Sequence, residues 1–418
     1  MFSCRARRMM FSIFRSAFSA LSLVAVVATT APALSAQERN PASAPIALTR
    51  TVTAPTATTE AINANAIPSP SAVEESRDIK PAKPVEKVTP HIAIILPLAS
   101  KTFGKVADAV RQGFLAGANA DGKSAPPYRV YAADDDSASL TAQYRKATAD
   151  GAVAIIGGVT RDGANVMARE SGRLPSLALN SPTISGPAAN DSELPERFFY
   201  VSLNLDWEAR LAARAAANEG FRRAAVVTAT TPLAKRLQES FEKEWIRLGG
   251  ELALRLAINT DSLDGTRISA ALEKAMADVV FMALDMKTAR FARPYLPVGM
   301  PVFSTSMTID PRADAVENLD LESVRFMEMP WFVQPDHPAV MAYSKPPEPM
   351  PIDYERLYAL GIDAWRLAQL VAQFDNPKRF PSLDGVTGRI TLEGHQFVRM
   401  LAAGEMRDGR PTLYKPSE

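Results

Sequence analysis

The sequence predicts an α/β fold of two Rossmann-like lobes, each a parallel sheet flanked by helices, joined by multiple hinge crossings. From His91 onward, a short apolar run, a turn and a stretch of helical period follow one another repeatedly. Helical stretches separate most of the apolar runs, and parallel strands require crossover connections of this kind. These units are too many for one compact sheet. We therefore expect two lobes, with chain crossings near Asn204 and Thr305.

The first unit shows the pattern clearly, because the apolar strand at 91–98 precedes a helix at 103–114 whose apolar residues lie three and four apart. Two later helices, at 139–149 and 233–248, are followed by Gly151 and Gly249, where a left-handed C-cap favours glycine. The other expected strands are the apolar runs at 128–132, 152–156, 176–179, 198–202, 224–228, 252–258, 279–283 and 301–304.

After the second crossing the pattern changes. A strand at 324–329 leads through a proline-rich loop to a helix at 354–374, and residues 388–399 alternate around a Glu-Gly turn as a hairpin does. We assign the helix to the first lobe and the hairpin to the second. The predicted boundaries of the lobes are therefore about 90–204 and 306–378 for the first, and about 205–305 and 379–418 for the second.

The segment before residue 90 predicts an exported chain. Residues 1–36 indicate a signal peptide, because arginines precede a short apolar stretch and small residues follow it, and a membrane anchor is the alternative. Residues 37–89 are rich in Pro, Ala and Thr and predict a disordered linker before a domain at 90–418. The only cysteine, Cys4, precedes the apolar stretch. We therefore expect a periplasmic protein with no apparent lipid anchor, and outer-membrane association is left open.

Composition and motifs argue against several classes of function. The net charge of +1 argues against bulk electrostatic capture of nucleic acid or acidic lipid. The three histidines are far apart, and the chain has no G-x-S-x-G elbow, no phosphate-binding loop and no dinucleotide motif at the first turn. The acidic run at 134–136 is better explained as a helix cap than as a metal site. We expect a non-enzymatic protein with no catalytic residues, no cofactor and no metal.

A small ligand held between the lobes would contact the polar loops that follow the strands of the first lobe, since helix N-termini there leave N–H donors unpaired. Serine, threonine and asparagine are also the usual helix caps and turn formers, so a purely structural role is the alternative. The candidate ligand-binding residues are Ser100, Lys101 and Thr102 after the first strand, Thr160 and Arg161 after the third, and Asn180 and Ser181 after the fourth.

Two apolar groups have both a core and a surface interpretation. The stripe at helical spacing around Gly361 predicts core packing, with the glycine allowing a close approach to the sheet, and a partner-binding face is the alternative. The second group comprises Met327, Met329, Trp331 and Phe332. Methionine and tryptophan are enriched at interfaces, so this group is either a docking surface or part of the core.

Two lobes built from discontinuous segments and ending in a hairpin are typical of a type I periplasmic binding protein. Local stretches resemble the LppC/LpoA-type family of penicillin-binding-protein activators, in the C-terminal domain of its long members. The resemblance spans residues 90–410 and is most specific at Met329-Pro-Trp331 and at Glu355-Arg-Leu-Tyr-Ala-Leu-Gly-Ile-Asp-Ala364. The other stretches are 92–98, 150–158, 177–180, 301–306 and 385–388.

The resemblance implies a periplasmic partner that stimulates a bifunctional penicillin-binding protein, a peptidoglycan synthase, with no chemistry of its own. The chain departs from the family pattern in two ways, because no cysteine follows the signal and the linker stands where long members have a helical-repeat domain. The alternative function is a substrate-binding protein of an ABC-type importer, which would close its lobes on an amino acid or another small polar solute.

Overall fold

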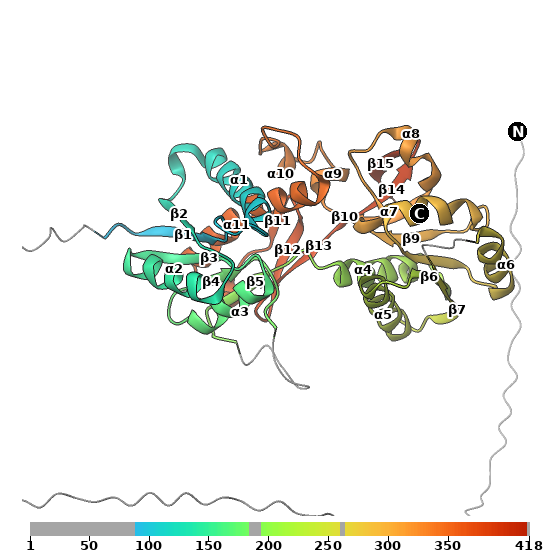
Figure 1. The fold of residues 1–418 in the computed structure, drawn as a ribbon, viewed down its shortest axis with the longest axis horizontal. Helices are drawn as coiled ribbons and strands as arrows, with labels where there is room; N and C mark the ends of the chain where they lie inside the picture. The colour runs from blue at the N-terminus through green and yellow to red at the C-terminus, as the bar shows by residue number, and fades with distance from the viewer. Residues whose placement is uncertain (1–87, 184–193, 260–263, 416–418) are drawn as a thin grey trace, which may run out of the picture. The chain divides into compact units, whose positions relative to one another are not determined.

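The computed structural model describes residues 88–183, 194–259 and 264–415, which form two helix-covered sheets (Figure 1). All of these residues belong to the compact unit 81–418. The sheets are mostly parallel, which confirms the predicted α/β class. The predicted signal peptide at 1–36 and nearly all of the predicted linker at 37–89 lie outside the described residues.

The first sheet, sheet A, has the strand order β11-β12-β13-β5-β4-β3-β1-β2. Its strands from β13 to β2 pair in parallel, and β11, β12 and β13 pair antiparallel. The strands are β1 (His91–Leu96), β2 (Tyr128–Ala132), β3 (Ala152–Gly157), β4 (Ser176–Ala178), β5 (Phe198–Val201), β11 (Leu383–Gly385), β12 (Gly388–Glu393) and β13 (Gln396–Met400).

Sheet A is covered on both faces (Figure 1). On strand β1, Ile92, Ile94 and Leu96 pack against α1 and α11, whereas Ala93 and Ile95 pack against α2 and α3. This double burial explains the continuous apolar run of the sequence, since a central parallel strand exposes neither face. The four helices are α1 (Gly104–Asp121), α2 (Ser137–Ala149), α3 (Arg161–Glu170) and α11 (Ile352–Gln373).

The second sheet, sheet B, has the strand order β15-β14-β10-β9-β8-β6-β7. Strands β10 to β7 pair in parallel, and β14 pairs antiparallel with both β10 and β15. The strands are β6 (Arg223–Ala229), β7 (Glu251–Ile258), β8 (Val279–Ala283), β9 (Val302–Thr305), β10 (Val324–Glu328), β14 (Ala402–Arg407) and β15 (Arg410–Leu413).

Sheet B is also covered on both faces. On strand β6, Ala224 and Val226 pack against α4 and α5, whereas Ala225 and Val227 pack against α6 and α7. These helices are α4 (Leu205–Asn218), α5 (Pro232–Arg247), α6 (Gly265–Ala275) and α7 (Met286–Ala292). The shorter helices are η1 (Gly122–Ser124), η3 (Arg293–Tyr295), η4 (Ser306–Thr308), α8 (Ala315–Asn318), η5 (Leu319–Leu321), α9 (Pro330–Val333), α10 (Pro338–Met341) and η6 (Pro377–Arg379).

The chain crosses between the sheets after β5, after β10 and after β13. The first crossing lies where it was predicted, near Asn204, which caps α4. The second prediction was wrong, because β9 ends at Thr305 but β10 remains in sheet B, parallel to β9. The segment 306–323 is therefore a connection within that sheet, and residues 306–328 do not belong to the first lobe.

The C-terminal hairpin also lies in the other sheet from the one predicted. Its second strand, β13, pairs in parallel with β5 through Gln396 and Phe397, so the hairpin of β12 and β13 extends sheet A. Only after Leu401 does the chain enter sheet B, where β14 pairs with β10. The alternation of the hairpin predicts its pairing with itself, but it contains no information about which sheet edge the second strand joins.

Helices α1 and α11 pack closely because glycines face each other. A Cβ atom on Gly113 would lie 1.8 Å from the carbonyl oxygen of Tyr358, and one on Gly361 would lie 2.2 Å from that of Val110. The stripe on α11 is therefore core, as predicted, but Gly361 permits the approach of helix α1 rather than of the sheet. The second apolar group is also core, since Met327, Met329, Trp331 and Phe332 are at most 8% exposed.

Candidate binding site

The predicted ligand-binding residues lie at one edge of sheet A. Strands β4, β3 and β1 are parallel neighbours, so the loops that follow them emerge side by side. This is the edge at which ligands bind in open α/β sheets. The loops carry residues 100–102, 160–161 and 180–181.

Two of these side chains are used in local turns and caps. The hydroxyl of Ser100 accepts hydrogen bonds from the backbone N–H groups of Thr102 (3.1 Å) and Phe103 (2.9 Å), and it donates to Asp135 Oδ2 at 3.0 Å. Thr160 is the N-cap of α3, because its Oγ1 accepts from the N–H of Gly163 at 3.0 Å. Both side chains satisfy donors that would otherwise be unpaired at a helix start.

The third loop is also bonded internally. The side-chain amide of Asn180 donates to the carbonyl of Val159 at 3.0 Å and accepts from the N–H of Ser181 at 2.8 Å, and Ser181 Oγ donates to Ser202 Oγ at 3.1 Å. A structural role in turns, the alternative to ligand binding, therefore accounts for the contacts of Asn180 and Ser181, as a capping role does for those of Ser100 and Thr160. The remaining candidates, Lys101, Thr102 and Arg161, are exposed, and a ligand-binding role for all seven stays a prediction.

The acidic run after β2 acts as a helix cap, as predicted. Asp136 is the N-cap of α2 and accepts from the N–H of Ser139 at 2.9 Å. Within the described ranges, no group of three or more His, Cys, Asp and Glu is placed to hold a metal ion. In the same ranges, no helix has both the length and the apolar character needed to cross a membrane.

A buried ionic cluster joins α11 to sheet B. Arg356 forms an ion pair with Glu328 of β10 (Nη2 to Oε2, 2.7 Å) and donates to the carbonyl of Ser306 at 3.1 Å. The backbone N–H of Ser306 in turn donates to Glu208 of α4 at 2.8 Å. We call Glu208, Ser306, Glu328 and Arg356 the junction cluster, and each of them is at most 9% exposed.

The electrostatics of the junction cluster centre on Glu208. Burial, followed by repulsion from Glu328, raises the pKa of Glu208 to about 7, against the hydrogen bonds from Ser306 and the charge of Arg356, which lower it. Burial disfavours the charge on Arg356, but the charge and hydrogen bond of Glu328 outweigh that effect and raise the pKa of the guanidinium. Arg356 is the cation that pairs directly with Glu328, and the buried Arg399 also interacts electrostatically with Glu208 and Glu328.

A second buried group explains part of the family-like sequence. Asp363 of α11 accepts hydrogen bonds from the backbone N–H groups of Val386 (3.1 Å) and Thr387 (2.8 Å) and from the Thr387 hydroxyl (2.7 Å). Burial raises the pKa of this carboxyl group. Arg399 of β13 donates to the carbonyls of Thr387 and Ser202, at 3.2 and 3.0 Å. The stretches 355–364 and 385–388 are therefore linked structurally.

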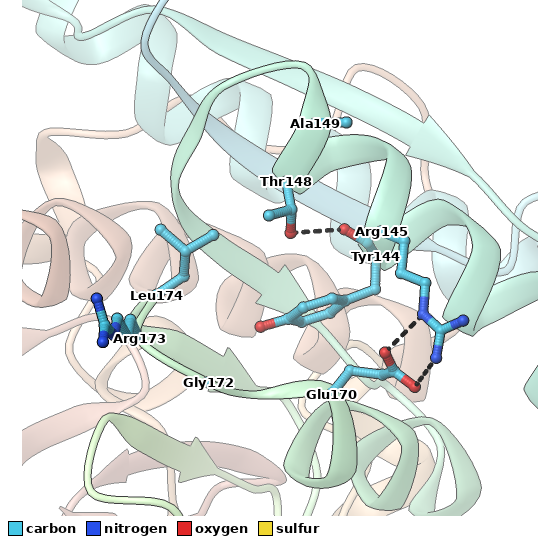
Figure 2. A pocket seen from close by; sticks show the side chains of 8 residues that line it. All are labelled: Tyr144, Arg145, Thr148, Ala149, Glu170, Gly172, Arg173 and Leu174. Atoms are coloured by element: carbon cyan, nitrogen blue, oxygen red, sulfur yellow. Dashed lines mark hydrogen bonds and ion pairs between the residues drawn. The ribbon is translucent and has the colours of Figure 1, made fainter.

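A cavity of about 420 Å³ lies between α2 and α3. Figure 2 shows the side chains that line it. The ring of Tyr144 forms one wall, with the ion pair between Arg145 and Glu170 (Nε to Oε2, 3.0 Å) on one side and Arg173 and Leu174 on the other. The hydroxyl of Tyr144 is hydrogen-bonded to Ser176 at 2.8 Å. None of the seven predicted ligand residues lines this cavity.

A second cavity, of about 530 Å³, lies under the proline-rich loop and includes Arg312, Lys345 and Glu355. Sequence analysis missed this site and the junction cluster. Glu355 and Arg356 lie among apolar residues on a helix that also carries Asp353, Asp363 and Arg366, and charged side chains are seldom fully buried without partners. The sequence therefore indicated that these two side chains form buried ion pairs, but it could not show which residues they pair with.

Two helix-covered sheets of mostly parallel strands, with three chain crossings among the described residues, define a protein of the type I periplasmic-binding-protein class. The family model "LppC putative lipoprotein" matches residues 63–261 and 253–408. The chain therefore belongs to the LppC family, which confirms the resemblance found in the sequence.

Several curated relatives carry the name penicillin-binding protein activator LpoA. The one from Glaesserella parasuis is 26% identical over 311 residues, covering 71% of this chain and 50% of that protein. The one from Enterobacter sp. is 24% identical over 300 residues, covering 62% of this chain and 40% of that protein. The chain thus spans half or less of the length of these two relatives.

Two solved structures share the fold. A protein from Chromobacterium violaceum, described as a "putative branched-chain amino acid ABC transporter", is 33% identical, with a TM-score of 0.65 over 76% of this chain and 100% of that chain. The C-domain of Haemophilus influenzae LpoA, described as a regulator of PBP1A, is 19% identical, with a TM-score of 0.60 over 78% of this chain and 100% of that chain. At 19% identity, the similarity to the LpoA C-domain shows a shared fold only.

Proposed function

We propose that this chain is a non-enzymatic periplasmic protein that activates a bifunctional penicillin-binding protein in peptidoglycan synthesis. The observation that carries the proposal is the family match over 63–261 and 253–408, together with curated relatives named as such activators. Those relatives are longer than this chain, so the partner and the activity are both part of the proposal. The predicted signal peptide at 1–36 would bring the chain to the periplasm.

The geometry supports a protein partner. Four of the seven predicted ligand residues already form hydrogen bonds, with nearby backbone groups or, for Ser181, with the side chain of Ser202. The junction cluster fastens α11 to sheet B by a buried ion pair, and separating a buried pair leaves an uncompensated charge at a cost of several kcal/mol. Such a chain presents a fixed surface more readily than it closes on a solute.

The first test is capture from the native envelope. The purified chain, immobilised and crosslinked to solubilised envelope from its own source, should recover a bifunctional penicillin-binding protein identified by mass spectrometry. An unrelated protein of similar size and charge serves as the control. Recovery of no peptidoglycan synthase, with the bait shown to be folded, would count decisively against the proposal.

A second candidate function is a substrate-binding protein of an ABC-type importer, and one observation favours it. The Chromobacterium violaceum protein is 33% identical over its whole length and is described as an ABC transporter. Thermal unfolding of the Lys345→Met variant in the presence of amino acids and short peptides separates the two candidates, because this variant lacks the ammonium with which the cavity under the proline-rich loop could hold a carboxylate. A solute present at 100 times its Kd should stabilise an importer protein by about 2.7 kcal/mol, whereas the activator proposal predicts no such shift with transported solutes.

A further inference from the structure

The cavity under the proline-rich loop is large enough for a small ligand. Its volume is about 530 Å³, within the range of small-molecule sites. Arg312 and Lys345 provide positive charge, the exposed Glu348 and the buried Glu355 provide negative charge, and prolines and Met350 provide apolar surface. It also lies where the two most specific family-like stretches meet, because Trp331 donates its indole N–H to a carboxylate oxygen of Glu355 at 2.9 Å.

The one buried carboxylate in this cavity is already occupied. Glu355 is 4% exposed and accepts hydrogen bonds from the guanidinium of Arg312, one of them from Nε at 2.9 Å, as well as from Trp331. Both oxygens of Glu355 are therefore engaged. The Arg312 guanidinium uses Nε and Nη2 in this pair, which leaves the N–H groups of Nη1 for another acceptor.

Lys345 is exposed and forms no ion pair within the described ranges, and the nearest charge that favours its ammonium is that of Glu355. Its ammonium lies 3.4 Å from the centroid of the Trp331 ring and makes one long hydrogen bond, of 3.4 Å, to the Trp331 carbonyl. An ammonium has three donors, so most of its capacity is unused. Partial burial, followed by the charge of Arg312, lowers the pKa of Lys345 to about 8. An anion placed beside the ammonium would stabilise its charged form and so raise this pKa.

We propose that this cavity binds a small organic carboxylate, held by the ammonium of Lys345 and the free edge of the Arg312 guanidinium. Charge-assisted hydrogen bonds of this kind are roughly twice as strong as neutral ones. Pro346, Pro347 and Met350 contact the apolar part of the molecule. The site is separate from the seven loop residues of sheet A, and it does not depend on the synthase role proposed above.

The direct test measures the titration of Lys345 in the isotopically labelled chain, by NMR of the lysine Cε and Nζ nuclei. The probes are sodium acetate and its neutral counterpart acetamide, at constant ionic strength adjusted with chloride. Acetate should raise the pKa of Lys345 from about 8 toward the ordinary lysine value of about 10.4, and acetamide should leave it unchanged. The affinity for acetate should correspondingly fall at least about tenfold between pH 7 and pH 10, as the ammonium loses its proton.

Variants separate a specific site from general anion binding. Lys345→Met should abolish acetate binding, Lys345→Arg should retain it, and Lys235→Met, which removes an exposed lysine on α5, should leave it unchanged. The melting temperature of each variant shows that the fold persists. Equal acetate binding by the wild type and Lys345→Met would overturn the proposal. So would the absence of any response of Lys345 to acetate at concentrations up to 100 mM, at which a site with the roughly millimolar affinity of a fragment would be saturated.

Discussion

At the scale of single residues, Arg356 is the side chain that holds the junction cluster together. It pairs with Glu328, whose side chain is 1% exposed, and no other ion pair of Glu328 occurs within the described residues. Removing one partner of a buried pair leaves the other charge uncompensated. Breaking a buried ion pair should therefore cost several kcal/mol of stability, whereas breaking an exposed pair should cost little.

We predict that Arg356→Met lowers the free energy of unfolding by about 3–5 kcal/mol. The matched control is Arg255→Met, which breaks a pair with Glu242 in which the arginine side chain is 56% exposed and should cost about 0–1 kcal/mol. Urea unfolding of both variants measures the difference. Similar losses in the two variants would show that the junction cluster is not the fixed joint described above.

Glu208 makes stability depend on pH. Its folded-state pKa of about 7 lies above the unfolded value of about 4.3, so the folded chain retains a proton that the unfolded chain has lost. The stabilisation is therefore present below pH 4.3 and is lost as pH rises through 7. The loss amounts to at most about 4 kcal/mol for this group.

In Glu208→Gln the amide oxygen still accepts from Ser306, but the group no longer titrates. Unfolding free energies at pH 5, 6, 7 and 8 should therefore fall less steeply in the variant than in the wild type. Glu251→Gln, a change at an exposed carboxylate, is the control and should keep the wild-type slope. The same slope in wild type and Glu208→Gln would refute the prediction.

Residue roles were predictable from the sequence where the partner is near in the chain. The caps at Asp136 and Thr160 each depend on an N–H three residues away, and their pattern is local. The pairs of Arg356 with Glu328 and of Lys345 with the Trp331 ring depend on how β10, the proline-rich loop and α11 come together. No sequence spacing encodes these contacts, so they required the structure.

At the scale of elements, the close contact of α1 with α11 depends on two glycines, which have no side chain to hold the helices apart. Gly113 and Gly361 bring each helix against the backbone of the other, at distances that no Cβ atom could occupy without movement. Helix–helix packing at normal separation would displace α11 from sheet A. The close contact with α1 therefore sets the position of α11, the helix that carries Glu355, Arg356 and Asp363.

We predict that Gly361→Ala destabilises the chain by about 1–3 kcal/mol, because the added methyl group meets the carbonyl of Val110. Gly172→Ala is the matched control, since a Cβ there has no atom within 4 Å and the backbone has no positive φ. That variant should be neutral or slightly stabilising. Equal effects in thermal unfolding would argue against close packing of these helices.

Most strands and long helices could be predicted, because apolar runs and helical periods are properties of consecutive residues. The sheet that each of the C-terminal strands joins could not be predicted. The strand at 324–328 and the hairpin at 388–400 have clear local patterns, yet both lie in the opposite lobe from the one predicted. Sheet membership is decided by pairing with β9, β14 and β5, which are distant in sequence.

At the scale of the whole molecule, the two-sheet architecture and family membership agree with the sequence analysis, and the ligand-binding role of the seven loop residues stays a prediction. Four of the seven predicted residues are engaged in caps and turns, and the cavity that contains Lys345 lies under the proline-rich loop. The two sheets are joined by a buried ion pair, and we propose that the chain acts by contact with another protein.

The measurement that tests this claim most directly is the rate of glycan-strand synthesis by the purified bifunctional penicillin-binding protein of the same source, titrated with the purified chain. We predict a saturable rise of about fivefold or more, the lower range of typical coupling free energies between sites. Addition of heat-unfolded chain should give no rise. An unchanged rate at saturating concentrations of folded chain would contradict the account.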